Sequence, residues 1–213
     1  MKKGLLTKTD VISILLCLVA IVPGLIVYSH LPAKIPTHFG VDGQPNGYSS
    51  RAFAVFGIPF ICAGLQTLLS ILTNRFWNEK RDSKGEIVIR MILPVVVMAV
   101  EGAMILYALG KLKSISSVIG LIMTVLYFVV GNYLPKVRRN VIYGIRTPHT
   151  LADPVVWDKT HRFAGTLMVI NSILMLIIMV MDLPLFLYVF VALIPIIIIF
   201  IYSEIIYRKR SSV

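Results

Sequence analysis

The sequence predicts an all-α membrane protein, a bundle of six transmembrane helices, and three observations support this fold class. Hydrophobic residues make up 57% of the 213 residues and charged residues only 15%, with a mean hydropathy of +0.86. A soluble domain has about 25% charged residues, so a water-soluble globule is excluded. The apolar residues form six continuous runs, and the basic residues lie mostly between these runs. Because lipid offers backbone groups no hydrogen-bond partner, continuous apolar runs indicate helices.

Each apolar run is close to the ~20 residues that a helix needs to cross a bilayer. We expect the six spans at residues 11–28, 53–73, 87–109, 115–134, 163–181 and 183–202. The first run follows basic residues, as in a signal peptide, but it lacks the small-residue cleavage pattern. We therefore expect this run to stay in the protein as the first span.

The basic residues predict how the bundle is oriented in the membrane. The net charge is +11, and 17 of the 21 Lys and Arg residues, with Arg90 counted in the second loop, fall in the two termini and in the second and fourth loops. Positive residues accumulate on the cytoplasmic side, so we expect the N- and C-termini in the cytoplasm. The same distribution indicates the anionic headgroups of the lipid bilayer as partners, and we expect no direct contact with nucleic acid.

Glu101 is the only acidic residue near the middle of a predicted span. A charged side chain at that depth costs about 2.5–3.5 kcal/mol on translocon scales, so we expect Glu101 to face other helices. Its small neighbours Ala99 and Gly102 would let a second helix approach closely. Two interpretations stay open: a proton or cation site, or a protonated or hydrogen-bonded carboxyl group that holds the bundle together.

The first loop, residues 29–52, is predicted to form a short hairpin outside the membrane. Asp42-Gly43 and Asn46-Gly47 are turn signals, and apolar residues alternate with others before them. His38 and Asp42 carry side chains that bind metals, but their spacing matches no established metal motif. We therefore expect a structured turn with a surface histidine, and no metal site.

The fourth loop, residues 135–162, is predicted to be ordered and to lie in the cytoplasm. Pro148 disfavours a helix at the residue before it, so residues 145–147 should be extended. Thr150, Asp153 and the proline that follows form a helix-start pattern. A helix should run from this point into the fifth span.

The side chains of this helix and of the segment before it offer several contacts. Asp158 and Arg162 are four residues apart and should pair on one face. Trp157 and His161 share another face, and the Trp157 ring suits the headgroup level of the bilayer. Arg146 has a planar guanidinium group that can bind a carboxylate, a phosphate or backbone carbonyls. We expect these groups to hold the loop as a compact cap on the bundle.

The sequence carries no recognisable catalytic motif. His149, Asp153, Asp158 and His161 match no zinc spacing, and the chain has no nucleophile elbow, HExxH or paired-carboxylate motif. We therefore expect no catalytic residue, no metal and no cofactor.

The motifs of the two long loops carry a resemblance to a known family. In the fourth loop they are Asn140, Gly144, Ile145, Arg146, Thr147, Pro148, Thr150, Leu151, Trp157, His161, Arg162 and Gly165. They resemble the signature of the SdpI family, bacterial multi-pass membrane proteins linked to immunity against secreted peptide toxins. In the outer loop, Leu31, Pro32, Ile35, Pro36, His38, Gly43, Gly47 and Tyr48 are similar to an uncharacterised module that often precedes this signature.

This resemblance implies two modules in a bacterial plasma-membrane protein. Residues 1–86 would form a two-helix module with the outer loop 29–52, and residues 87–213 a four-helix module with the cytoplasmic loop 135–162. We expect function to depend on ten residues of this signature and its flank: Asn132, Asn140, Gly144, Arg146, Thr147, Pro148, Thr150, Trp157, His161 and Arg162. One departure stands out, because the family usually has an aromatic residue, commonly Trp, where this chain has His149.

The leading functional hypothesis is a non-enzymatic immunity or resistance protein against a secreted peptide toxin. The resemblance also implies that some family members pass a toxin signal to a cytoplasmic transcriptional repressor that they hold at the membrane. A small transporter or channel with a pathway near Glu101 and Asn132 is the alternative, and a membrane-embedded enzyme is the third hypothesis.

Overall fold

The computed structural model describes residues 5–40, 42–76, 84–112 and 114–211. Within these residues, six helical segments are long and apolar enough to cross a membrane, which confirms the predicted fold class. The six segments are Lys8–Ile26, Phe53–Phe76, Lys84–Ala108, Ser116–Lys136, Pro154–Val180 and Leu185–Ser211. The chain is a multi-pass membrane protein.

The first span consists of two consecutive helices, α1 (Lys8–Val19) and α2 (Ile21–Ile26). Thr7 begins α1 with a capping box: its hydroxyl group accepts a hydrogen bond from the Asp10 N–H, and the Asp10 carboxylate accepts one from the Thr7 N–H. Pro23 has no N–H for the carbonyl four residues earlier, which accounts for the break between the two helices.

The outer loop forms the predicted hairpin. Its elements are η1 (Tyr28–His30), β1 (Lys34–Phe39) and β2 (Pro45–Ser50), followed by the π-helical turn η2 (Phe53–Gly57) and α3 (Ile58–Phe76). The two strands pair antiparallel, with Ile35 opposite Ser49. The Phe39 ring packs edge-on against Tyr107 of α4. The hairpin is therefore anchored to the helical bundle.

The second half of the chain contains the longest helices. Its elements are α4 (Lys84–Ala108), α5 (Ser116–Tyr133), η3 (Leu134–Lys136), α6 (Pro148–Ala152), α7 (Pro154–Val180) and α8 (Leu185–Ser211). Asp153 caps α7 by accepting hydrogen bonds from the N–H groups of Val155 and Val156. The predicted helix start is confirmed, and α7 is continuous from there through the fifth span.

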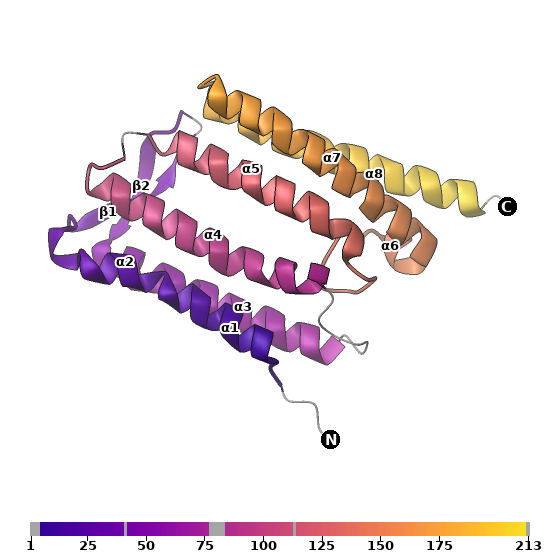
Figure 1. The fold of residues 1–213 in the computed structure, drawn as a ribbon, viewed down its shortest axis with the longest axis horizontal. Coiled ribbons are helices and arrows are strands. Elements are labelled where there is room, and N and C mark those ends of the chain that lie inside the picture. Colours follow the sequence, from indigo (N-terminus) through magenta and orange to yellow (C-terminus); the bar gives the residue numbers. More distant parts are fainter. Residues whose placement is uncertain (1–4, 41, 77–83, 113, 212–213) are drawn as a thin grey trace.

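The long helices lie side by side and run alternately in opposite directions (Figure 1). The start of α1, the short helix α6 and the end of α8 lie at one end of the bundle, which we call the terminal end. The β-hairpin lies at the opposite end, which we call the hairpin end. The two termini therefore share one side of the membrane, as predicted, while the cytoplasmic location of that side stays a prediction.

The helices pack in two groups. One group contains α1, α3 and α4, and the other contains α5, α7 and α8. Within the second group, α5 and α7 approach closely where two glycines meet: a Cβ atom on Gly131 would lie 2.8 Å from the Gly165 carbonyl oxygen. The face of α5 that carries Gly120, Thr124, Tyr127 and Gly131 is buried. This small face serves helix packing, as its residue types indicate.

Large apolar side chains cover the outside of both helix groups. Examples are Phe60, Leu68, Ile173, Phe190 and Ile197, all more than half exposed. In water such a surface would aggregate, whereas lipid chains cover it without cost.

Candidate functional site

The fourth loop and the helices around it form a compact cap at the terminal end. Asn140 closes the first turn of this cap, because its side-chain oxygen accepts hydrogen bonds from the N–H groups of Ile142 (2.8 Å) and Tyr143 (2.6 Å). Its amide nitrogen donates to the carbonyls of Arg138 and Tyr143. Asn140 thus stabilises a turn through local backbone bonds, the role that asparagine often has in loops.

His161 holds the next part of the cap. Its side chain is 1% exposed, and its Nε2 accepts a hydrogen bond from the Ile145 N–H at 3.0 Å. Its Nδ1 lies 2.9 Å from the Trp157 carbonyl oxygen, to which it donates. The two bonds require the neutral imidazole with its proton on Nδ1. Gly144 has a φ of 102°, and a Cβ there would lie 2.5 Å from His161 Nε2, so only glycine fits.

Trp157 is part of the protein interior, and its predicted position at the headgroup level is wrong. The ring is 1% exposed and stacks on His161, with 3.9 Å between ring centroids. Its indole N–H donates to the Val137 carbonyl at 3.0 Å. The carbonyl of the loop takes the place of the water that would satisfy this N–H at a membrane surface.

Thr147 and Thr150 form a capping box at the start of α6, each accepting a hydrogen bond from the N–H of the other. Thr147 is extended, as the proline after it predicts. Pro148 is the first residue of α6, where its missing N–H has no cost. The Ser203 hydroxyl of α8 lies 3.5 Å from that of Thr147, so the cap also contacts the last helix.

Arg146 and Arg162 are the exposed charged members of the motif. Arg146 donates from Nη1 to the Val141 carbonyl at 2.6 Å. No partner is found for the rest of its guanidinium group, or for that of Arg162, within the described residues. The ion pair that the spacing of Asp158 and Arg162 allows is not formed in this part of the structure. Both side chains are exposed on α7, where water competes with a single surface contact.

Asn132 lies outside this cluster. It is exposed on α5, and its amide donates to the Phe128 carbonyl of the same helix at 2.8 Å. The structure therefore does not bring Asn132 to the other motif residues, nor to Glu101 on α4.

His149 contacts α8 within the same chain. Its ring stacks on Tyr207, with 4.2 Å between centroids, and its Nε2 forms an ion pair with Glu204. Nearby, Arg210 forms an ion pair with Asp153 at 2.7 Å, and this bond lowers the pKa of Asp153. The two ion pairs connect the end of α8 to the cap.

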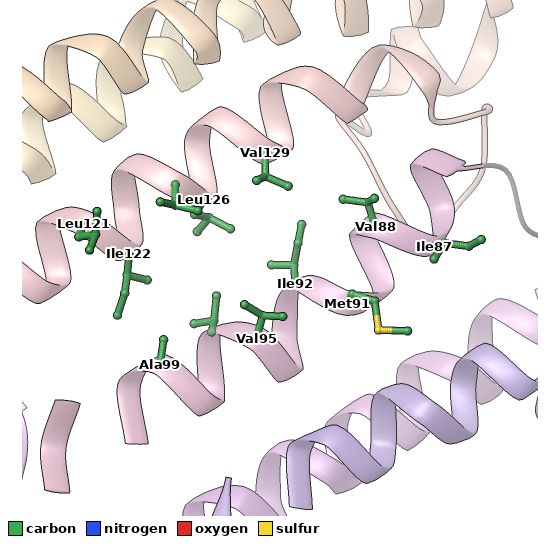
Figure 2. A pocket seen from close by; sticks show the side chains of 12 residues that line it. Ile87, Val88, Met91, Ile92, Val95, Ala99, Leu121, Ile122, Leu126 and Val129 are labelled. Carbon is green, nitrogen blue, oxygen red and sulfur yellow. The ribbon is translucent and has the colours of Figure 1, made fainter. Parts of the chain in front are cut away.

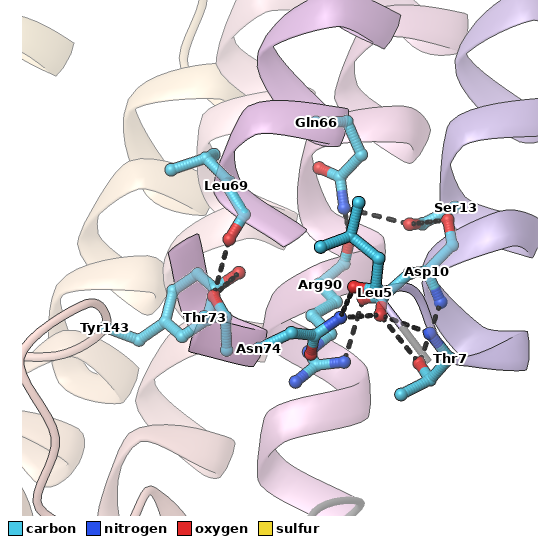
Figure 3. A network of polar contacts seen from close by, with 10 residues as sticks. All are labelled: Leu5, Thr7, Asp10, Ser13, Gln66, Leu69, Thr73, Asn74, Arg90 and Tyr143. Carbon is cyan, nitrogen blue, oxygen red and sulfur yellow. Dashed lines mark hydrogen bonds and ion pairs between the residues drawn. The ribbon is translucent and has the colours of Figure 1, made fainter. Parts of the chain in front are cut away.

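A second polar cluster, which the sequence did not predict, lies between α1, α3 and α4 (Figure 3). Arg90 forms an ion pair with Asp10 at 2.9 Å, and neither side chain is more than 1% exposed. The other Asp10 oxygen accepts a hydrogen bond from Asn74, and Gln66 donates to Ser13 and to the Arg90 carbonyl. This cluster links three helices near the terminal end.

Arg90 was counted with the second loop in the topology prediction, and that placement is wrong. The residue lies inside α4 and already within the expected span 87–109, so it does not belong to the second loop. The sequence held one signal, the helical spacing of Asp10, Ser13 and Cys17, which places them on one face of α1. Nothing in the sequence pairs that face with Arg90 of α4.

Glu101 faces the bundle, as predicted, and is 1% exposed. Neither oxygen of its carboxyl group has a hydrogen-bond partner among the described residues. Cys62 of α3 lies within electrostatic reach of Glu101, and Cys17 of α1 within reach of Cys62. No group of three His, Cys, Asp or Glu side chains in the described part of the chain is placed to hold a metal ion.

An apolar cleft of about 460 Å³ separates α4 from α5 (Figure 2). Its lining consists of Ile87, Val88, Met91, Ile92, Val95, Val96 and Ala99 of α4 and Leu121, Ile122, Val125, Leu126 and Val129 of α5. These side chains offer no hydrogen bond to a polar solute. The cleft is therefore unsuited to be the aqueous path that the transporter alternative requires.

The outer-loop residues form a separate group at the hairpin end. His38 is exposed on β1, and its Nδ1 is hydrogen-bonded to the Asn46 side chain. A Cβ on Gly47 would lie 2.8 Å from that of His38 across the strand pair, and the Gly43 turn contacts Ser116 at the start of α5. The outer motif therefore stabilises the hairpin and its contact with the bundle.

Residues 136–203 match the SdpI/YfhL protein family, and this segment contains every predicted motif residue except Asn132. The chain is also 25% identical to "Immunity protein SdpI" of Bacillus subtilis (strain 168) over 174 residues, which are 80% of this chain and 81% of that protein. Over residues 136–203, the chain is therefore similar to the SdpI family.

The SdpI-family segment is preceded by a second match. Residues 15–63 match DUF1648, a domain of unknown function, and this segment contains the hairpin. Neither match includes α4, so the predicted module boundary between residues 86 and 87 stays a prediction. No solved structure matches the chain. The family match, the similar immunity protein and the six spans indicate a multi-pass protein of the bacterial membrane.

Proposed function

We propose that this protein is a membrane immunity protein that protects its own cell from a secreted peptide toxin. The observation that carries the proposal is the similarity to an immunity protein over about four fifths of both chains. The ordered cap adds support, because all its buried motif residues lie in the segment that matches the family. In this proposal the protein acts by binding, without catalysis.

We further propose that the exposed arginines of the cap form the part that meets a partner. The buried motif side chains form hydrogen bonds with the chain's own backbone, as seen for Asn140, Trp157 and His161. Arg146 and Arg162 keep guanidinium groups directed to the surrounding medium at the same end of the bundle. Such groups bind carboxylates and phosphates bidentately, so a cytoplasmic repressor with an acidic patch is the partner that this surface would accept.

The experiment that tests immunity is a killing assay in a strain without the gene. Cells carrying the intact gene, an empty vector or an Arg146→Lys variant are exposed to culture supernatant that contains the strain's own peptide toxins. The proposal predicts survival with the intact gene and death with the empty vector. Equal killing of both strains, with the protein present in the membrane at normal levels, would contradict it.

Repressor recruitment has a separate readout. A small DNA-binding repressor encoded beside the gene, fused to a fluorescent protein, should move to the membrane when toxin is added. Recruitment should require the exposed Arg146 side chain. A repressor that stays in the cytoplasm while protection is intact would remove signalling from the proposal and leave immunity in place.

A small transporter is the second candidate function, and the buried carboxyl group of Glu101 is the observation that favours it. Ion or proton flux into liposomes that contain the purified protein would support this candidate. Protection from toxin without any flux would count against it.

A further inference from the structure

Glu101 occupies an unusual place in the membrane interior. It lies on α4 about eleven residues from Arg90, which corresponds to about 16 Å along the helix axis. Its neighbours on the buried face of α4 are apolar, namely Val97, Met104 and Ile105. Because the described residues provide no hydrogen bond to either oxygen, a negative charge on this group would be unpaired in a medium of low dielectric constant.

The carboxyl group does not hold the helices together. Helix association by a polar side chain requires a hydrogen-bond partner on the neighbouring helix, and the described part of α3 provides none for Glu101. A leucine or methionine would fill the same volume without the cost of burying a polar group. An unpaired buried carboxyl group calls for a role other than packing.

A line of polar side chains connects the neighbourhood of Glu101 to the terminal end. On α3, Cys62, Gln66 and Ser70 recur every four residues, and Gln66 and Ser70 are buried. On α1, Cys17 and Ser13 lie four residues apart on the buried face. We call these five residues, with the ion pair of Asp10 and Arg90, the polar seam.

The polar seam contains further atoms that can bond to a proton carrier. The Ser70 hydroxyl group and the Nε and Nη2 atoms of Arg90 are buried and have no hydrogen-bond partner within the described residues. Figure 3 shows Gln66 and Ser13 in contact between α3 and α1, directly above the ion pair of Asp10 and Arg90. Water molecules that entered the seam would find donors and acceptors along its length.

Between Glu101 and the hairpin end, apolar side chains close the protein interior to water. Ile105, one turn from Glu101 toward the hairpin end, belongs to an apolar cluster with Leu31, Ile35, Ala54 and Val55. All five side chains are at most 4% exposed. Toward the terminal end, Glu101 has Val97 on its own helix and the Cys62 thiol of α3 within electrostatic reach, and toward the hairpin end it has an apolar seal.

We propose that Glu101 is a proton-binding site that exchanges its proton with the terminal end of the bundle through the polar seam. Binding adds one proton to a carboxylate oxygen, and release returns it to water, so no other bond changes. The other titratable group that faces Glu101 is the Cys62 thiol, with the Cys17 thiol behind it. A metal cation would need several oxygen ligands, which the described residues do not place here.

This site does not depend on the immunity function. A protein that protects its cell without flux, and one that moves ions, would both have the same protonated carboxyl group. The apolar seal predicts proton binding without a continuous leak across the membrane.

Dicyclohexylcarbodiimide, an apolar reagent that modifies protonated carboxyl groups, tests the site in the full-length protein in lipid vesicles. Mass spectrometry of the digested protein should show modification at Glu101 at neutral pH. The modified fraction should fall about tenfold for each pH unit above the value at which the group ionises. Glu204, an exposed carboxylate in an ion pair, serves as the internal control and should stay unmodified.

One variant and one alternative ion make the test decisive. Glu101→Gln should abolish the modification and, because the carboxyl group has no partner to lose, should leave thermal stability unchanged. Failure to modify Glu101 in the folded wild-type protein at any pH would overturn the proposal. Protection from the reagent by Na⁺ at constant pH would also overturn it, since that result identifies a metal-cation site.

The route is tested in sealed vesicles of known orientation, with different pH values inside and outside. The extent of modification at Glu101 should follow the pH at the terminal end. Gln66→Leu, which removes a polar group from the middle of the seam, should slow this response, whereas Thr67→Val on the neighbouring face of α3 should not. Modification that follows the pH at the hairpin end would overturn the proposed route.

Discussion

At the scale of single residues, the motif divides into side chains that build the cap and side chains that remain free. Asn140, Thr150, Trp157 and His161 are buried, and their polar groups bond to the chain's own backbone. Arg146 is exposed and uses one of its donors. Substitution of a side chain that builds the cap should change the amount of folded protein. Substitution of a free side chain should change the activity of the protein.

The first prediction concerns Arg146. In Arg146→Lys, the ammonium group keeps the charge but loses the planar arrangement of donors. One charge-assisted hydrogen bond contributes about 1.5 kcal/mol, so partner binding should weaken about tenfold. The killing assay should show reduced protection at normal membrane levels. Arg208→Lys, an exposed arginine outside the motif, should protect fully, and full protection by Arg146→Lys would refute the binding role.

For His161, in contrast to Arg146, we expect a substitution to reduce the stability of the protein. His161→Ala leaves the Ile145 N–H without its partner, removes the side-chain hydrogen bond to the Trp157 carbonyl and creates a cavity beside the indole ring. Together these changes should destabilise the protein by about 2–4 kcal/mol. The measurement is the amount of protein in the membrane and its thermal stability after extraction. Normal values for both would show that the cap does not depend on this side chain.

At the scale of helices, the ion pair of Asp10 and Arg90 joins α1 to α4. Breaking a buried pair by removing one partner typically costs about 3–5 kcal/mol, because the other charge stays buried and unpaired. Arg90→Met and Asp10→Leu should therefore each lower the thermal stability. The double variant, in which neither charge of the pair remains, should recover the part of the loss that comes from the unpaired charge, whereas the hydrogen bonds of Asp10 to Thr7 and Asn74 stay lost. A double variant as unstable as the sum of the single ones would contradict this interpretation.

The contact of α5 with α7 depends on two glycines. In Gly131→Ala the new methyl group would lie 2.8 Å from the Gly165 carbonyl oxygen, so the helices must move apart. We expect a loss of about 1–3 kcal/mol. Gly64→Ala on α3 is the matched control, because a methyl group there meets no atom within 4 Å. Equal melting temperatures of the two variants in detergent would disprove the close approach.

At the scale of the whole molecule, the open question is which end of the bundle faces the cytoplasm. The terminal end carries the basic groups Arg146, Arg162, Arg208 and Arg210, which favours the cytoplasmic side. In a background with Cys17 and Cys62 replaced by alanine, an impermeant maleimide should label Asp42→Cys in intact cells. It should label Val141→Cys after lysis only. The reverse pattern would invert the topology.

The sequence by itself determined the six spans, the hairpin and the ordered fourth loop. Continuous apolar length, the Asn46-Gly47 turn and the start of α7 at Asp153 are local signals, because each depends on a few neighbouring residues. The family signature also identified most residues of the cap. These signals indicate which segments are helices and which residue types are constrained. They do not indicate which helices pack against one another.

Only the tertiary structure decided which side chains meet. It placed Trp157 in the protein interior, separated Asp158 from Arg162, paired His149 with Glu204 and brought Arg90 to Asp10 across 80 residues. It also left the buried carboxyl group of Glu101 without a hydrogen-bond partner among the residues that the structure describes. The physical reason is that the apolar pattern of a membrane helix changes little around its circumference, since lipid and helix neighbours are equally apolar. The side that faces a neighbour is therefore set by packing between helices that lie far apart in the chain.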